Sequence, residues 1–84
     1  MSKAAKLLQK VLLARSDANL AFEDLCFLLE RTGFSRRPGR GSHAIFAREG
    51  IPEIVNVQPL GSKAKPYQVK QVRDLIVRYK LEIE

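Results

Sequence analysis

The sequence GFSRRPGRGSHAIFAR occupies residues 33–48 and marks a change from a helical to a strand pattern. Before Gly33 the apolar residues recur at helical spacing, and after it they alternate with polar ones. This alternation predicts two short strands, Phe34–Arg37 and Ser42–Arg48. Residues 38–41, Pro-Gly-Arg-Gly, favour a turn between them, so we expect the strands to pair as an antiparallel hairpin.

Two helices are predicted upstream of this hairpin. The segment from about Lys3 to Arg15 is amphipathic, and its apolar face contains Ala4, Leu8, Val11 and Leu12. A second helix is expected over Phe22–Thr32, ending at Gly33, a residue suited to the left-handed position that closes a helix. Phe27 lies nearly opposite the other apolar residues of that helix, so we expect the N-terminal helix to cover it.

One further strand and one further helix are predicted downstream. Ile54–Gln58 has strand character and lies between loops at Arg48–Glu53 and Pro59–Lys65. Pro66 opens a helix at its favoured first position. The apolar stripe of that helix consists of Val69, Val72, Ile76 and Tyr79. The order α-α-β-β-β-α predicts an α+β fold, in which a three-stranded antiparallel sheet carries helices on one face.

Alternation along the strands also predicts where the one histidine of the chain points. His43 lies on the opposite face of its strand from Ala44 and Phe46. If Phe46 and the valines of the third strand point toward the helices, His43 points to the uncovered face of the sheet. Asn56 and Gln58 of the third strand are expected on that same face.

The positive charge of the chain is concentrated in two clusters. Lys and Arg number 15 against 9 Asp and Glu, a formal net charge of +6. One cluster runs from Arg31 to Arg48 and the other from Lys63 to Arg73, and neither contains an acidic residue. Such clusters also occur on ordinary solvated surfaces, but two of them flanking a Gly-Ser-His turn favour phosphate binding. The expected partner is therefore a polyanion.

Several classes of protein are excluded by composition. A length of 84 residues predicts one domain. Cys26 is the only cysteine, which excludes an internal disulfide and a cysteine-based zinc site, and its place on a helix predicts a buried apolar role. No His and carboxylate cluster has metal-ligand spacing, so we expect no metal and no cofactor. No apolar run approaches the roughly 18 residues of a membrane span, and no secretion signal is apparent, so a cytoplasmic protein is predicted.

The segment from Gly33-Phe34 through the basic turn to Gly41-Ser42-His43 resembles the HicA family of toxin–antitoxin mRNA interferases. The resemblance covers residues 19–81, and residues 56–69 look like a longer subtype of that family. The chain length predicts a single domain over residues 1–84, and the position of Phe27 predicts that residues 1–18, outside the family core, form an extra helix packed on it. Short HicA forms carry Pro-His where this chain has Gln58-Pro59, and a helical tail, Leu81–Glu84, replaces the usual ending.

The resemblance implies a fold like that of double-stranded-RNA-binding domains and a metal-independent endoribonuclease that cleaves mRNA. His43 corresponds to the general acid/base of the family. The toxin is expected to be a monomer outside the complex with a HicB-like antitoxin, which neutralises it. The residues assigned to bind the nucleic acid are Arg36, Arg37, Arg40, Gly41, Ser42, Lys63 and Lys65.

The chemistry of RNA is compatible with a metal-independent endoribonuclease, because RNA supplies its own nucleophile in the 2′-hydroxyl group. The enzyme has to position the phosphodiester, neutralise its charge and move protons, and imidazole does the last near neutral pH. Two alternatives stay open. One is a non-catalytic RNA-binding module of the same fold, which reads backbone and shape. The other is a basic adaptor whose partner is a protein.

Overall fold

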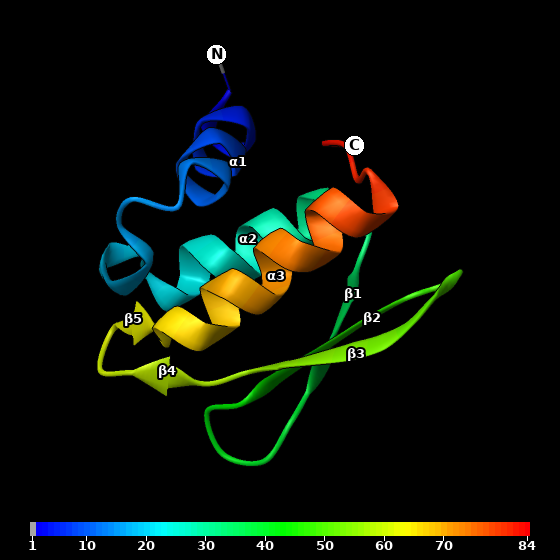
Figure 1. Ribbon diagram of the computed structural model, residues 1–84. Coiled ribbons are helices and arrows are strands. Elements are labelled where there is room, and N and C mark those ends of the chain that lie inside the picture. Colours follow the sequence, from blue (N-terminus) through cyan, green and yellow to red (C-terminus); the bar gives the residue numbers. More distant parts are fainter. Residues whose placement is uncertain (1) are drawn as a thin grey trace.

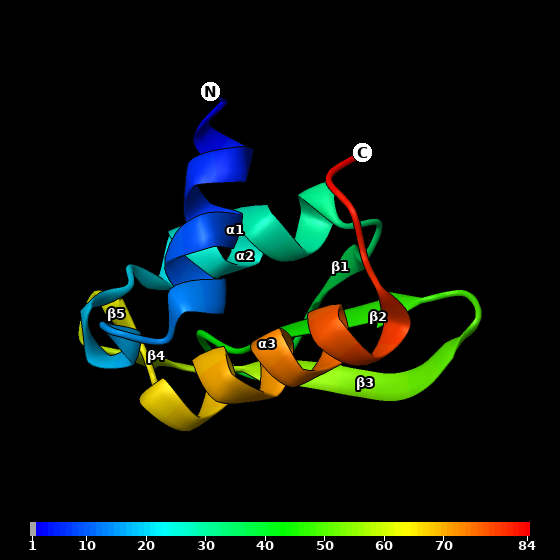
Figure 2. The same cartoon turned by 45° about the horizontal axis from the view of Figure 1, so that its top comes forward.

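The computed structural model describes residues 2–84, with two main helices lying on one face of a sheet and a third helix above them (Figures 1 and 2). The elements in chain order are α1 (Lys3–Leu13), the 3-10 helix η1 (Asp17–Asn19), α2 (Phe22–Arg31), β1 (Ser35–Pro38), β2 (Ala44–Arg48), β3 (Ile51–Val57), β4 (Pro59–Leu60), β5 (Lys63–Ala64) and α3 (Pro66–Tyr79).

The main sheet has the order β1-β2-β3, and both pairings are antiparallel. Arg36 lies opposite Phe46 in the first pair, and Phe46 lies opposite Val55 in the second. Phe46, Val55 and Val57 are fully buried. They belong to β2 and β3, which run beneath α2 and α3 (Figure 2). The predicted α+β architecture and strand order are therefore confirmed.

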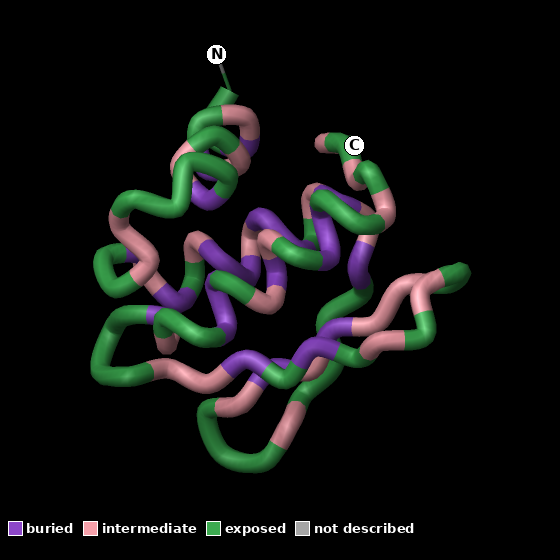
Figure 3. The backbone as a smooth tube through the Cα atoms, in the orientation of Figure 1, coloured by how far each residue is buried: buried purple, intermediate pink, exposed green. Residues whose placement is uncertain are grey.

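The core is continuous from the sheet through the helices. Figure 3 shows buried stretches along both α2 and α3, and the buried residues of these helices include Leu25, Leu28, Leu29, Val69, Val72, Leu75 and Ile76. Cys26 is fully buried among them, as predicted, and burial raises the pKa of its thiol to about 11. The thiol is therefore protonated and unreactive near neutral pH.

The strand boundaries differ from the sequence prediction. β3 begins at Ile51, because a tight turn at residues 49–50 replaces the predicted loop; Pro52 is tolerated because β3 is an edge strand. The predicted loop at residues 59–65 contains the small β4–β5 hairpin, which pairs with Ala21 through Lys63. β2 begins at Ala44 rather than Ser42, because residues 39–43 form the turn.

The N-terminal helix packs on α2 through a slightly different face than predicted. Ala4, Leu7 and Val11 are buried, whereas Leu12 is 44% exposed, so its predicted place in the apolar stripe is wrong. The Lys3 ammonium lies 4.8 Å from the centre of the Phe27 ring, and Phe27 is half-buried against the core. The helix therefore helps to cover the second apolar side of α2.

The C-terminal tail is not helical, contrary to the expectation for Leu81–Glu84. Helix α3 ends at Tyr79, and Lys80 takes a left-handed conformation with a φ of 51°. The tail then runs alongside the end of α2, where Arg31 donates two hydrogen bonds of 2.9 and 2.7 Å to the main-chain oxygen of Glu84. Leu81 and Ile83 pack on the core in strand-like alternation, which explains the extended form.

Arg73 joins three parts of the chain. It donates hydrogen bonds of 2.9 and 3.0 Å to the Asp17 carboxylate and one of 3.1 Å to the carbonyl oxygen of Val11. The hydrogen bonds that Arg73 donates to Asp17 raise the pKa of Arg73, and the side chains are only 16% and 24% exposed. Because α3 carries Arg73, this contact ties the end of α1 and the η1 turn to the main helical layer.

We predict that Arg73→Met lowers the free energy of unfolding by about 2 kcal/mol, because it leaves the Asp17 carboxylate without its bidentate partner. Urea denaturation measures this change. The control is Arg78→Met, which removes a pair with Glu53 whose arginine is 64% exposed, and a clearly smaller loss is expected. Equal losses of unfolding free energy in both variants would show that the contact of Arg73 with Asp17 stabilises the fold no more than the exposed pair of Arg78 and Glu53.

Candidate functional site

The turn between β1 and β2 holds the histidine in a defined backbone geometry. The Gly39 N–H donates to the carbonyl oxygen of His43 at 3.1 Å, and the His43 N–H donates to the carbonyl oxygen of Arg40 at 3.0 Å. Gly41, at the tip, has a φ of 59°, which favours glycine. Both main-chain hydrogen bonds span Gly41 and close the turn around it.

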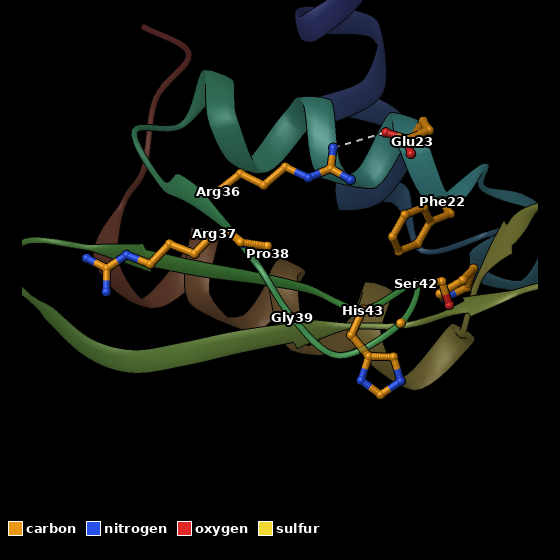
Figure 4. A pocket seen from close by; sticks show the side chains of 10 residues that line it. Phe22, Glu23, Arg36, Arg37, Pro38, Gly39, Ser42 and His43 are labelled. Carbon is orange, nitrogen blue, oxygen red and sulfur yellow. Dashed lines mark hydrogen bonds and ion pairs between the residues drawn. The ribbon is translucent and has the colours of Figure 1, made fainter.

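This turn forms one wall of a cleft of about 720 Å³, shown in Figure 4. The opposite wall is the start of α2, and Pro59 of the small hairpin closes one end. The lining residues are Phe22, Glu23, Arg36, Arg37, Pro38, Gly39, Gly41, Ser42, His43 and Pro59. The cleft therefore brings together five of the residues singled out from the sequence.

His43 is half-buried and immediately precedes β2. Because Ala44 and Phe46 are buried toward the helices, alternation turns the His43 side chain to the other face of the sheet. Figure 4 shows the imidazole ring on the far side of the sheet from α2. The predicted placement of His43 on the uncovered face thus agrees with the structure.

The two neighbouring arginines of β1 point in opposite directions. Arg36 faces α2, donates a hydrogen bond of 3.1 Å to Glu23, and lies 6.0 Å from the centre of the Phe46 ring. The hydrogen bond that Arg36 donates to Glu23 raises the pKa of Arg36. Arg37 lies opposite Ile45 and so shares the uncovered face with His43. Of the two, Arg36 already has an anionic partner.

Gly41 leaves open space at the tip of the turn. A methyl group added there would have no atom within 4 Å. Ser42 follows it in the lining of the cleft, and Arg40 precedes it as an exposed residue that does not line the cleft. An anion can therefore approach the backbone of the turn without meeting a side chain at residue 41.

Lys63 and Lys65, the two lysines assigned to bind the nucleic acid, lie outside the cleft. Lys63 donates a hydrogen bond of 2.8 Å to the side-chain oxygen of Asn19. Lys65 donates one of 2.7 Å to the side-chain oxygen of Gln58, which directly precedes Pro59 of the cleft wall. Lys65 is thus next to the cleft, while Lys63 belongs to the contact between the small hairpin and η1.

Two lining residues, Phe22 and Glu23, were not predicted as part of a site. Both begin α2, where an apolar residue and an acidic residue have ordinary structural roles, so the sequence carried no local signal. Glu23 reaches Arg36 across 13 positions of sequence, and this pairing depends on the packing of β1 against α2. Among residues 2–84, no group of three or more His, Cys, Asp or Glu side chains could hold a metal ion.

A comparison with protein families matches residues 22–77 to the family described as the HicA toxin of bacterial toxin–antitoxin systems. This chain belongs to the HicA toxin family. The match runs from the start of α2 almost to the end of α3 and includes the whole turn, whereas α1 and the C-terminal tail lie outside it. HicA toxins are the toxin partners of HicB antitoxins in type II systems.

Comparisons with curated proteins and with solved structures gave no match. The helices within residues 2–84 include none with the length and apolar character that crossing a membrane requires.

We predict that Gly39→Ala displaces His43, because the added methyl group would lie 3.0 Å from both the Cβ and the carbonyl oxygen of His43. Overpacking of this kind costs about 1–3 kcal/mol of stability. Nuclear magnetic resonance measures the displacement as shifts of the His43 amide and ring signals. Gly50→Ala is the control for direct contact: its φ of 88° strains an alanine, but a methyl group there meets no atom within 4 Å, so the His43 signals should stay in place. Unchanged His43 signals in Gly39→Ala would contradict this prediction.

Proposed function

We propose that this HicA toxin is an endoribonuclease that cleaves mRNA without a metal ion, with His43 as its general acid/base. The observation that carries the proposal is the position of His43, which borders the cleft at the open glycine turn and shares the uncovered face of the sheet with Arg37. The HicA family membership supports the same activity.

The reaction follows from the chemistry of RNA. The 2′-oxygen forms a new bond to phosphorus, and the bond from phosphorus to the 5′-oxygen of the next nucleotide breaks. The imidazole of His43 takes the proton of the 2′-hydroxyl and then delivers it to the leaving 5′-oxygen, which returns the ring to its starting form. The products are a 2′,3′-cyclic phosphate and a free 5′-hydroxyl, so no water or metal ion is consumed. General acid–base catalysis of this kind contributes roughly 10²–10⁴-fold.

The charge of the phosphodiester is met by the turn and by Arg37. Main-chain N–H groups around Gly41, together with the Ser42 hydroxyl, donate to the phosphate oxygens. Arg37 shares the face of His43 and has a long, flexible side chain, so it can bind the same phosphate or an adjacent one. Arg40, at the exposed tip of the turn, also binds phosphate. Arg36 contributes less to phosphate binding, because its charge is already paired with that of Glu23.

We predict that His43→Ala lowers RNA cleavage by at least about 10²-fold and abolishes growth inhibition, because it removes the proton-transfer group. The fold remains intact, since the side chain lies outside the core. Cleavage assays with matched circular dichroism spectra measure both effects. The control is Asn56→Ala, an exposed residue on the same face. Full activity of His43→Ala would contradict the catalytic role.

Cleavage is also expected to persist in the presence of EDTA. A strict requirement for a divalent metal would contradict the proposed mechanism, even if His43 proved to be essential.

The second candidate is an RNA-binding module without catalysis. The basic uncovered face favours it as much as it favours an enzyme, because such a face binds RNA through phosphates and shape. Binding and cleavage assays of the native protein distinguish the RNA-binding module from the nuclease. Binding of single-stranded RNA with no cleavage after long incubation would indicate the module, and binding that does not depend on salt would indicate a protein adaptor.

We further propose that a HicB-like antitoxin inhibits the toxin by covering the turn. Residues 36–43 are basic and mostly exposed, so an acidic or strand-forming antitoxin surface is the expected complement. An ordinary interface buries about 800 Å² on each partner, which is enough to cover the cleft and its rim. Attraction between opposite charges speeds the association, and its rate falls as salt increases.

We predict that the antitoxin protects His43 from diethyl pyrocarbonate. His43 is the only histidine, so the absorbance of the modified imidazole reports on this site alone. Free toxin should be modified readily, whereas the complex should be protected and inactive as a nuclease. If His43 stays fully reactive in an inhibited complex, the antitoxin acts at another surface and direct coverage is wrong.

A further inference from the structure

A buried glutamine organises the outer edge of β3 next to the cleft. Gln68 of α3 is 1% exposed. Its side-chain oxygen accepts a hydrogen bond of 3.0 Å from the main-chain N–H of Gln58, and its side-chain nitrogen donates one of 3.0 Å to the carbonyl oxygen of Asn56. A strand edge offers such alternating groups to a further strand. Here one side chain takes that place and fixes the backbone of residues 56–58.

Gln58, the residue held in this way, directly follows the end of β3, and His43 directly precedes β2. Ala44 pairs with Val57 in the register of β2 and β3, so continuing the antiparallel register by one step would bring residues 43 and 58 opposite each other. Gln58 lies two residues after Asn56, so alternation along the strand puts both residues on the uncovered face of the sheet. Pro59, the next residue, lines the cleft together with His43.

Gln58 in turn holds Lys65. The side-chain oxygen of Gln58 accepts a hydrogen bond of 2.7 Å from the Lys65 ammonium, at the start of α3. A lysine ammonium has three donors, so this bond leaves two for an anion. Arg36 on the other side of the cleft differs, because its partner Glu23 is a carboxylate. A neutral carboxamide orients a cation without cancelling its charge.

We propose that Gln58 is a positioning residue that holds the Lys65 ammonium beside His43, where Lys65 contacts a phosphate of the bound RNA. Gln68 fixes the backbone from which Gln58 acts. The inference rests on the proposed endoribonuclease function and assigns Gln58 and Lys65 to its substrate. The neutrality of Gln58 is essential, since a carboxylate at the same place would pair with Lys65 and compete with the phosphate.

The charge argument is tested by RNA binding at several salt concentrations. The probe is a single-stranded RNA with 2′-O-methyl groups at every ribose, which cannot undergo attack by the 2′-hydroxyl. Lys65→Ala should make the slope of log affinity against log salt shallower by about 0.7, the value of one contact on a single strand. Gln58→Glu should cause the same loss although it retains Lys65.

The matched control is Gln71→Glu, which adds an identical charge on α3, the helix that follows Lys65, but away from the cleft. Its slope should equal that of the native protein. If Gln58→Glu keeps the native slope, or if Gln71→Glu reduces it equally, the specific pairing of Gln58 with Lys65 is wrong.

The positioning argument is tested by cleavage of unmodified RNA. Gln58→Ala should lower kcat/KM by about 5- to 10-fold, because Lys65 is then free to adopt many rotamers. The double variant Gln58→Ala/Lys65→Ala should be no worse than Lys65→Ala alone. Melting temperatures within about 2 °C of the native value show that stability does not explain the result. If the loss of kcat/KM in the double variant equals the product of the two single losses, the two residues act independently and the positioning role of Gln58 is wrong.

The two proposals fail separately. If the native protein binds RNA but does not cleave it, and Lys65→Ala and Gln58→Glu still reduce the salt slope alike, then the nuclease function is wrong while the pairing with phosphate stands. If His43→Ala abolishes cleavage and the Gln58 variants behave like the native protein, the nuclease function stands while the role of Gln58 is wrong.

Discussion

The structure depends on the burial of Phe46 in the central strand β2. Its ring is fully enclosed between the neighbouring strands and the helices, and it lies opposite Arg36 on one side and Val55 on the other. Because strand side chains alternate, burial of Ala44 and Phe46 leaves His43 no direction except the uncovered face. A slip of one residue in the register would exchange these faces, burying the imidazole and exposing the ring. The same packing that stabilises the domain therefore also orients the candidate catalytic group.

Around the cleft, the partners of the basic side chains decide which charges can serve a phosphate. Arg36 is paired with Glu23 and Arg73 with Asp17, so both have structural anions as partners. Lys65 is held by a neutral carboxamide instead. A cation bound to a carboxylate gains little from an additional anion, whereas a cation oriented by an amide keeps its full attraction. The net charge of the chain is thus a poor guide to its binding surface.

The order of elements, the buried faces of the strands and the role of Cys26 could be predicted, because each depends on local periodicity. The errors occurred where distant segments meet. Leu12 follows helical spacing but is exposed, since only the side of α1 that carries Leu7 meets the rest of the core. The tail is extended because Arg31, far away in sequence, binds the main chain of Glu84. The β4–β5 hairpin forms beside Ala21, a pairing that its own residues do not indicate.

For the candidate site, the sequence by itself determined the family resemblance, the Gly-Ser-His turn and the face on which His43 lies. These features depend on neighbouring residues and on alternation along one strand. Only the tertiary structure decided that Phe22 and Glu23 form the opposite wall, that Arg36 rather than Arg37 is neutralised, and that Gln68 and Gln58 orient Lys65. These contacts join α2, the sheet and α3, and hydrogen bonds between separate elements depend on how the layers pack, which local sequence patterns do not encode.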